Sequence, residues 1–216
     1  MKILKTILTI IVLTITSTGL YAQGLGARAG INFQNINGKD IDGDKLENSL
    51  KVGFNAGLNY EIPVGTDIYF QPGLLFSTKG ADVDREIDLL DYKLSVSYIE
   101  LPLNVVFKPL LGTGHMLLGF GPYVAYGVGG KAKADDDEYD VEFTKKVELG
   151  DPIDVVYLKA FDAGANFIIG YEMSNMLSVQ LNAQLGLVNF YPESYMADDD
   201  TAWKNTGFGL SIGYRF

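Results

Sequence analysis

The chain has 216 residues, a formal net charge of −10 and no cysteine. This length allows one domain, and the lack of cysteine excludes a disulfide framework and a cysteine-linked lipid anchor. The negative charge excludes nucleic acid as an expected partner. Most of the 27 acidic residues fall in four segments, 37–50, 80–97, 130–160 and 190–204, and the chain between these segments carries few charges.

The first 22 residues have the pattern of a secretory signal peptide. Lys2 and Lys5 give a positive start, an apolar run with interspersed threonines follows from Ile7 to Ile15, and the segment ends on Leu20-Tyr-Ala-Gln. The apolar run is too short to span a bilayer, which argues against a membrane anchor. We therefore predict a signal peptide over 1–22, cleaved after Ala22, and an exported domain over 23–216.

Eight stretches of the remaining chain alternate apolar with small or polar residues at a period of two, as half-buried β-strands do. They are 25–34, 51–62, 68–77, 99–108, 116–129, 161–172, 177–187 and 207–216. The less apolar face is rich in Gly, Asn, Gln and Ser and poor in the Lys and Glu that a solvated exterior carries. This composition fits the narrow lumen of a barrel whose bulky face points outward.

The connections between these stretches alternate in length. Those at 63–67, at 109–114 and around Ser174 and Asn175 are about five or six residues long, whereas the other four run from about fourteen to about thirty residues. Short turns at one end, long loops at the other and an even number of strands are typical of outer-membrane barrels. We predict an all-β, eight-stranded, antiparallel up-and-down transmembrane β-barrel, with both termini and the short turns in the periplasm and the long loops outside the cell.

Outward aromatic residues fall near both ends of the predicted strands, as in the two interfacial girdles of such barrels. Those placed near the short turns are Phe70, Phe107, Tyr171, Tyr214 and Phe216; those toward the long loops are Phe33, Phe76, Tyr126 and Phe161. The last strand must close against the first, because an open edge is unsatisfied in lipid. Ile212, Tyr214 and the terminal Phe216 also resemble the C-terminal signal that the barrel-assembly machinery recognises.

Three stretches carry a family resemblance: Tyr98-Ile-Glu-Leu-Pro-Leu-Asn-Val-Val-Phe-Lys, Gly119-Phe-Gly-Pro-Tyr-Val-Ala-Tyr-Gly and Asp162-Ala-Gly-Ala-Asn-Phe-Ile-Ile-Gly-Tyr-Glu. Together with Leu20-Tyr-Ala-Gln at the end of the predicted signal peptide, they resemble the PorT-like, or porin-family, outer-membrane barrels. These are small barrels of the OmpA/OmpX type. The resemblance spans about residues 24–216. It implies an eight-stranded barrel from a Gram-negative bacterium, in a family whose founding members are associated with protein secretion.

Seven charged residues occupy inward positions of the predicted strands or their ends. They are Arg28, Glu61, Glu100, Lys108, Asp162, Glu172 and Arg215. Because a buried charge needs a partner, we predict an internal salt-bridge network. The alternative is a gate, in which the pairs rearrange to open a small conduction path. Eight strands leave an interior that side chains just fill, so a wide pore is not expected.

The acidic loops suggest at most a weak cation site. Asp40, Asp42 and Asp44 resemble part of a calcium loop, but the position that should hold a bidentate glutamate is Lys51. Asp135, Asp136 and Asp137 form a second carboxylate cluster. With one histidine and no cysteine, no transition-metal site is expected, and we predict no cofactor.

No catalytic set is visible in the sequence. The single histidine, His115, falls in or beside a short turn, and no serine and carboxylate accompany it in a triad pattern. We predict a non-enzymatic barrel with a structural or surface role, in contact with outer-membrane lipid, lipopolysaccharide and the assembly machinery. Three alternatives remain: a secretion-accessory or partner-binding barrel that acts chiefly through loop 130–160, a narrow channel, and a soluble lipocalin-like carrier.

Overall fold

The computed structural model describes residues 24–40, 43–46, 48–83, 92–134, 137–152, 154–193 and 201–216. The predicted signal peptide, 1–22, lies outside the described residues. Within these ranges, no helix is long and apolar enough to cross a bilayer.

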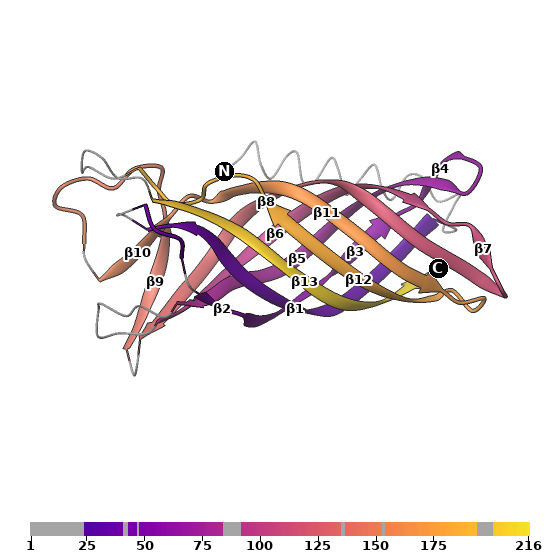
Figure 1. Cartoon of the computed structure of the whole chain (residues 1–216), viewed down its shortest axis with the longest axis horizontal. Coiled ribbons are helices and arrows are strands. Elements are labelled where there is room, and N and C mark those ends of the chain that lie inside the picture. The colour runs from indigo at the N-terminus through magenta and orange to yellow at the C-terminus, as the bar shows by residue number, and fades with distance from the viewer. Residues whose placement is uncertain are drawn as a thin grey trace, which may run out of the picture.

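Within the described residues, eight antiparallel strands close into a ring in the order β1-β3-β5-β6-β8-β11-β12-β13 (Figure 1). The ring strands are β1 (Leu25–Lys39), β3 (Lys51–Tyr60), β5 (Ile68–Val83), β6 (Tyr92–Phe107), β8 (Gly114–Ala134), β11 (Phe161–Glu172), β12 (Leu177–Gly186) and β13 (Ala202–Arg215). Each strand pairs with its neighbour in sequence, and β13 returns to β1. The predicted up-and-down barrel is therefore confirmed.

The closing seam joins the first and last strands of the ring. Gly26 to Lys39 of β1 pair in unbroken antiparallel register with Arg215 to Ala202 of β13. The backbone N–H of Phe216 donates to the carbonyl of Leu25 at 2.9 Å, so hydrogen bonding continues to the last residue. This pairing leaves no open edge between the chain ends.

The two ends of the barrel differ. Short turns, the small strands β4 (Ile62–Gly65) and β7 (Leu110–Leu111) and the C-terminus lie at one end, which we call the turn end (Figure 1). The opposite loop end carries β2 (Asn48–Ser49), β9 (Asp137–Phe143) and β10 (Val155–Leu158). In the turns, Asp67 and Met176 adopt φ of 56° and 67°, the left-handed region that a tight reversal requires.

Strand structure extends further toward the loop end than the sequence predicted. The acidic segment 80–97 was expected to be a loop, but β5 continues to Val83 and β6 begins at Tyr92. The segment 130–160 likewise contains the end of β8 and both β9 and β10. Charged residues at these positions face water beyond the apolar part of the wall, so they are compatible with strand structure although they interrupt the apolar alternation.

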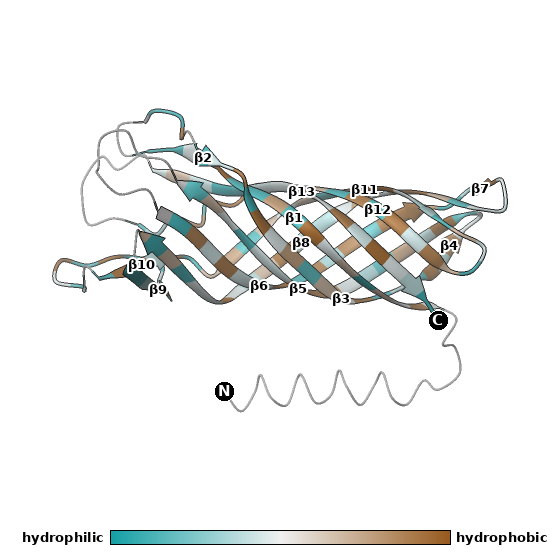
Figure 2. Ribbon diagram, turned by 90° about the horizontal axis from the view of Figure 1, so that it is seen from below, coloured by the Kyte–Doolittle hydropathy of each residue, from teal (hydrophilic) through white to brown (hydrophobic). Residues whose placement is uncertain are grey.

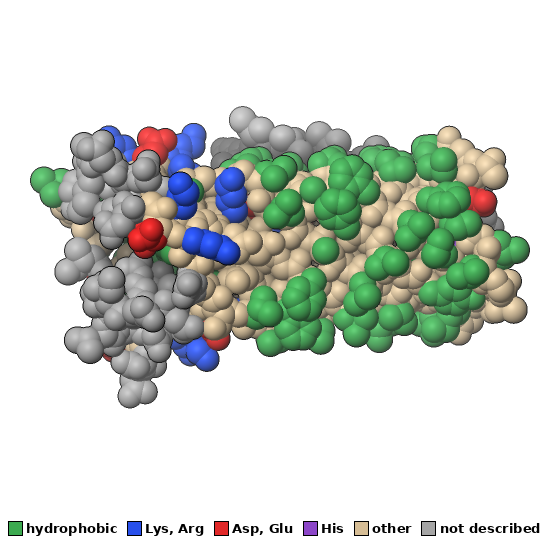
Figure 3. Space-filling view, in the orientation of Figure 1, with side chains coloured by type: hydrophobic (Ala, Val, Ile, Leu, Met, Phe, Trp, Pro, Cys, Tyr) green, Lys and Arg blue, Asp and Glu red, His purple; other side chains and the backbone are tan. Residues whose placement is uncertain are grey.

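The apolar face of the ring points outward. Alternate residues of each ring strand are exposed and apolar. Figure 2 shows hydrophobic and hydrophilic residues alternating along the strands, and Figure 3 shows hydrophobic side chains over the wall from its middle to the turn end. We call this zone the apolar band; Ile31, Phe54, Phe120, Leu181 and Phe208 belong to it. The opposite face buries polar side chains such as Asn32, Asn104 and Asn166. A soluble lipocalin-like carrier needs the reverse arrangement.

Several of the predicted girdle aromatics are neighbours in the ring. Toward the loop end, Phe33 stacks on Phe208 with ring centroids 5.2 Å apart, and Tyr126 lies opposite Phe161 in the β8–β11 register. At the turn end, the rings of Tyr214 and Phe216 meet edge to face at 5.3 Å.

Candidate functional site

Seven charged side chains are buried among the described residues, and the half-buried Arg215 pairs with two of them. The basic members are Arg28, Lys79, Lys108 and Arg215, and the acidic members are Glu61, Glu100, Asp162 and Glu172. The two signs are therefore balanced inside a barrel whose whole chain carries −10. Such balance is expected where each buried charge requires an opposite partner.

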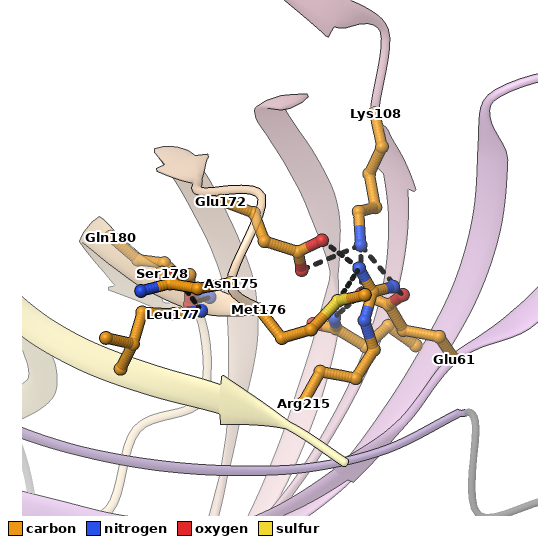
Figure 4. A network of polar contacts seen from close by, with 10 residues as sticks. Glu61, Lys108, Glu172, Asn175, Met176, Leu177, Ser178, Gln180 and Arg215 are labelled. Atoms are coloured by element: carbon orange, nitrogen blue, oxygen red, sulfur yellow. Dashed lines mark hydrogen bonds and ion pairs between the residues drawn. The ribbon is translucent and has the colours of Figure 1, made fainter. Parts of the chain in front are cut away.

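At the turn end, four of these side chains form one cluster (Figure 4). Lys108 Nζ lies 2.8 Å from Glu61 Oε2 and 3.0 Å from Glu172 Oε2. Arg215 extends its two terminal nitrogens to the same two carboxylates, one to each. Gln71 donates a further hydrogen bond to Glu61 at 3.1 Å. Two cations thus bridge two anions, and the turn end of the lumen is closed by this turn-end cluster.

A second cluster lies closer to the loop end and centres on Lys79. Its Nζ lies 3.2 Å from Glu100 Oε1 and 3.2 Å from Asp162 Oδ2, and all three side chains are at most 1 % exposed. The same nitrogen lies 4.2 Å from the centroid of the Tyr123 ring, whose hydroxyl donates to Asp162 at 3.2 Å. One lysine therefore forms ion pairs with two carboxylates and lies over an aromatic face.

The sequence prediction missed Lys79. The alternation in the third stretch was followed only to Ser77, and Lys79 is the next inward position on β5, which continues to Val83. Extending the period of two past the apolar residues would have found it. The inward Tyr98 and Tyr123 were also missed. Tyr98 lies just before the predicted stretch 99–108 and Tyr123 lies within the stretch 116–129, and both stretches were interpreted from their outward apolar residues.

Arg28 does not join either cluster. Among the described contacts its Nη1 donates to Asn182 Oδ1 at 3.4 Å, and no ion pair involves it, although it lines the same small cavity as Glu100. Arg28 was one of the seven residues of the predicted internal network, but the described ion pairs do not include it. The network is divided in two, and Arg28 lies between the halves at the start of a chain of polar side chains.

That chain of polar side chains crosses several strands of the middle lumen. Asn182 donates to Ser211 Oγ at 3.0 Å, and Ser211 donates in turn to Asn55 Oδ1 at 3.5 Å. On the other side of the barrel, Asn166 donates to Asn104 Oδ1 at 3.0 Å. Buried polar groups are stable when hydrogen bonded in this way. The Ser211–Asn55 and Asn166–Asn104 bonds join strands that are not neighbours in the ring.

Two cavities on either side of Arg28 show how little space remains. Each offers about 20 Å³, enough for roughly one water molecule. One is lined by Asn32, Ser77 and Glu100 among others, and the second by Glu61, Gln71 and Arg215 among others. The described lumen is therefore packed with side chains along its length, as expected for eight strands.

The loop end of the lumen is apolar, which the sequence did not predict. Tyr98, Tyr123, Phe190 and Trp203 are buried there with Ile36, Leu94, Val141 and Leu158. Trp203 packs against Phe190 and Tyr191 with ring centroids 6.1 Å and 5.0 Å apart. Because Val141 and Leu158 belong to β9 and β10, this cap fixes part of segment 130–160 on the barrel.

The predicted cation candidates lie in the loops. Asp42, Asp135 and Asp136 lie outside the described residues. Asp40 and Asp44 bond to each other through the Asp44 backbone N–H and Asp40 Oδ1, at 2.9 Å. Asp137 begins β9. In the described part of the chain, no group of three or more His, Cys, Asp or Glu residues could hold a metal ion.

His115 and the three residues of the predicted C-terminal assembly signal lie at the turn end of the barrel. His115 is the second residue of β8, opposite Glu172 in the β8–β11 register and opposite Leu110 of β7. Ile212, Tyr214 and Phe216 lie on the outer face at the turn end and are all exposed.

This arrangement, with an apolar exterior, a hydrogen-bonded interior and a closed antiparallel ring, can be compared with known proteins. Residues 21–191 match the family described as outer membrane protein beta-barrel domain. The chain belongs to this family. No curated protein matches the outer-membrane barrel described here.

Solved structures that match the chain include Ail, a domain of NalP and AlkL. Ail, the attachment invasion locus protein of Yersinia pestis, is 16 % identical and aligns with a TM-score of 0.39 over 90 % of this chain and 99 % of Ail. The translocator domain of the autotransporter NalP from Neisseria meningitidis is 10 % identical, with a TM-score of 0.33 over 100 % of this chain and 97 % of that domain. The outer membrane protein AlkL, solved in lipid bilayers, is 14 % identical, with a TM-score of 0.29 over 90 % of each chain.

Proposed function

We propose that this outer-membrane barrel is a non-enzymatic, non-conducting anchor of the PorT-like type that presents its loops outside the cell to a partner protein. The termini and the turn end face the periplasm, and residues 40–50, 84–91, 135–160 and 187–201 connect the strands at the cell surface. Its mechanism is structural: the wall holds it in lipid, the packed lumen keeps it rigid, and the loop end carries the contacts.

The filled lumen is the observation that carries this proposal. The turn-end cluster, the Lys79 cluster and the aromatic cap follow one another along the barrel, and the cavities between them hold roughly one water each. Moving a solute through would require breaking buried ion pairs that are costly to separate. The sequence shows no Ser-His-carboxylate triad pattern around His115, which supports a non-enzymatic role.

Segment 130–160 is the best candidate for the contact. β9 extends the sheet beyond β8, β10 pairs with β9, and both are held by the aromatic cap, so an ordered platform supports the loop tip. At that tip, Leu149 is 84 % exposed. Binding residues are often carried on loops that a rigid scaffold positions, so the ordered support favours recognition of a protein over a purely solvated loop.

Orientation can be tested by labelling, because the chain contains no cysteine. We expect a membrane-impermeant maleimide to label Lys145→Cys, at the loop end, on intact cells. Thr66→Cys, in a short turn, should react only after lysis. The reverse pattern contradicts the proposed orientation.

Conductance and binding are tested with the same purified full chain. We expect no conductance steps in a planar bilayer; steps that disappear in Glu100→Ala would instead support the narrow channel. For the partner, removal of residues 148–151 should leave assembly intact and abolish a co-purifying protein. Removal of Val64 and Gly65, at the end of β4 beside the turn, serves as the control, and equal loss in both would contradict a loop-end contact.

A further inference from the structure

We propose that Lys39, Lys45 and Lys204 form a binding site for the phosphate of an anionic lipid headgroup, on the outer surface of the β1–β13 seam. The site lies beyond the apolar band on the side of the loop end, where Figure 3 shows basic side chains gathered between the hydrophobic wall and the loops. Its placement in the outer leaflet rests on the orientation given under the proposed function.

The strand register places the three lysines together. Lys204 lies opposite Asn37, and Lys39, two residues further along β1, is its diagonal neighbour on the same face. Lys45 lies directly opposite Lys39 on the other side, through an isolated antiparallel bridge. All three side chains are exposed. Directly opposed residues on one sheet face have Cβ atoms about 5 Å apart, and diagonal ones about 7 Å.

Neighbouring like charges of this kind are destabilising unless an anion lies between them. The other lysines at the same level have acidic partners: Lys93 lies 3.7 Å from Asp82, and Lys133 lies 3.0 Å from Glu138. Among the described residues, no ion pair involves Lys39, Lys45 or Lys204. These three neighbouring charges therefore have no carboxylate partner among the described residues, and an external anion is the missing partner.

The position of the site selects a lipid. Phe208 and Phe33 stack at the edge of the apolar band, and Lys204 precedes Phe208 by four residues on the same face of β13, toward the loop end. With the rise and tilt of a barrel strand, that separation is about 10 Å of height. Headgroups occupy roughly 5–8 Å beyond the hydrocarbon, and a lysine reaches that level by extending toward it.

Charge around the site also favours a membrane source. The chain has a net charge of −10, which repels a large soluble polyanion. A lipid headgroup approaches sideways within the leaflet, at the level that the lysines reach. A phosphate monoester, with up to two negative charges, matches two or three adjacent ammonium groups.

The test measures lipid selectivity in a bilayer. The full chain is reconstituted in phosphatidylcholine, and electron spin resonance compares the immobilised fractions of spin-labelled phosphatidic acid and spin-labelled phosphatidylcholine. We expect wild type to prefer phosphatidic acid, and Lys39→Gln and Lys204→Gln each to lower that preference about fivefold. Lys93→Gln and Lys133→Gln, which remove lysines already paired with carboxylates, should change it less than twofold. Heat-modifiable mobility on electrophoresis verifies that each variant is folded.

No preference in wild type, or an equal loss in the two control variants, overturns the proposal. Inorganic phosphate, added at an ionic strength at which chloride has no effect, should leave the preference for phosphatidic acid unchanged. If inorganic phosphate displaces the spin-labelled phosphatidic acid, the assignment of the site to a lipid is overturned. The measurement depends on neither orientation nor a protein partner, so its failure and the failure of the proposed function are separate results.

Discussion

Lys79 and Asp162 form an ion pair inside the barrel, with Nζ 3.2 Å from Oδ2 and neither side chain exposed. Glu100 completes the group at the same distance from Nζ. The pair joins β5 to β11, which are not neighbours in the ring, so it holds opposite parts of the wall together. The cluster is therefore where a single substitution should have its largest effect on stability.

Removing the central cation should destabilise the barrel strongly. Lys79→Met leaves Glu100 and Asp162 buried without a positive partner, which costs about 3–5 kcal/mol. The measurement is the free energy of unfolding by urea in lipid vesicles. Lys93→Met removes an exposed pair and should cost less than about 1 kcal/mol. If the two variants unfold alike, the Lys79 cluster does not stabilise the barrel.

The turn-end cluster should behave as a coupled unit. Lys108 and Arg215 each contact both Glu61 and Glu172, so the loss of one contact changes the value of the others. A double-mutant cycle of Lys108→Met with Glu172→Gln should give a coupling energy of about 1–3 kcal/mol. The same cycle of Lys108→Met with Glu138→Gln, at the other end of the barrel, should give a value near zero; equal values would contradict a local cluster.

The β8–β9 hairpin should respond to acid. Hydrogen bonds from Lys131 and then Lys133 lower the pKa of Glu138 below its ordinary value. Because the pKa in the folded chain is below that in the unfolded chain, this stabilisation is fully present above the unfolded pKa and is lost as the pH falls through the folded one. A carboxyl-carbon NMR titration should show Glu138 titrating below an unpaired glutamate.

A paired substitution provides the control for that titration. In the Lys131→Gln/Lys133→Gln variant the Glu138 midpoint should rise to the ordinary range for glutamate. A Glu138 midpoint that does not move in this variant would mean that the hydrogen bonds are not the cause of the lowered pKa.

The terminal phenylalanine should matter more for assembly than for stability. Phe216 is 58 % exposed and contributes one backbone hydrogen bond to Leu25, so Phe216→Ser removes an outward contact without opening the lumen. We expect several-fold less folded barrel in cells and an unfolding free energy in vesicles reduced by about 1–2 kcal/mol, from the loss of apolar burial in lipid. Phe208→Ser, at a position that is 51 % exposed but not C-terminal, should lower stability without the assembly defect.

The parts of the fold that were predicted depend on local pattern. The alternation in 207–216 and in the other seven stretches, together with alternating connection lengths, was enough for strand number, antiparallel order and the outward apolar face. These features follow because successive side chains of a strand point to opposite faces, and because lipid requires apolar side chains on the outer face and a hydrogen-bonded backbone. Both effects can be recognised from consecutive residues. The same alternation of inward and outward positions along each strand places Glu61, Glu100, Lys108, Asp162 and Glu172 inside the barrel.

The pairing of those residues depended on the tertiary structure. Parity places Lys108 and Arg215 inside the barrel, but only strand tilt and register bring them to the same two carboxylates, which are distant in sequence. The sequence alone therefore determined which residues face lipid and which face the lumen, because this depends on neighbours along one strand. The closed ring decided the division into two clusters, the role of Lys79 and the aromatic cap around Trp203, because these contacts join strands whose relative height no local pattern encodes.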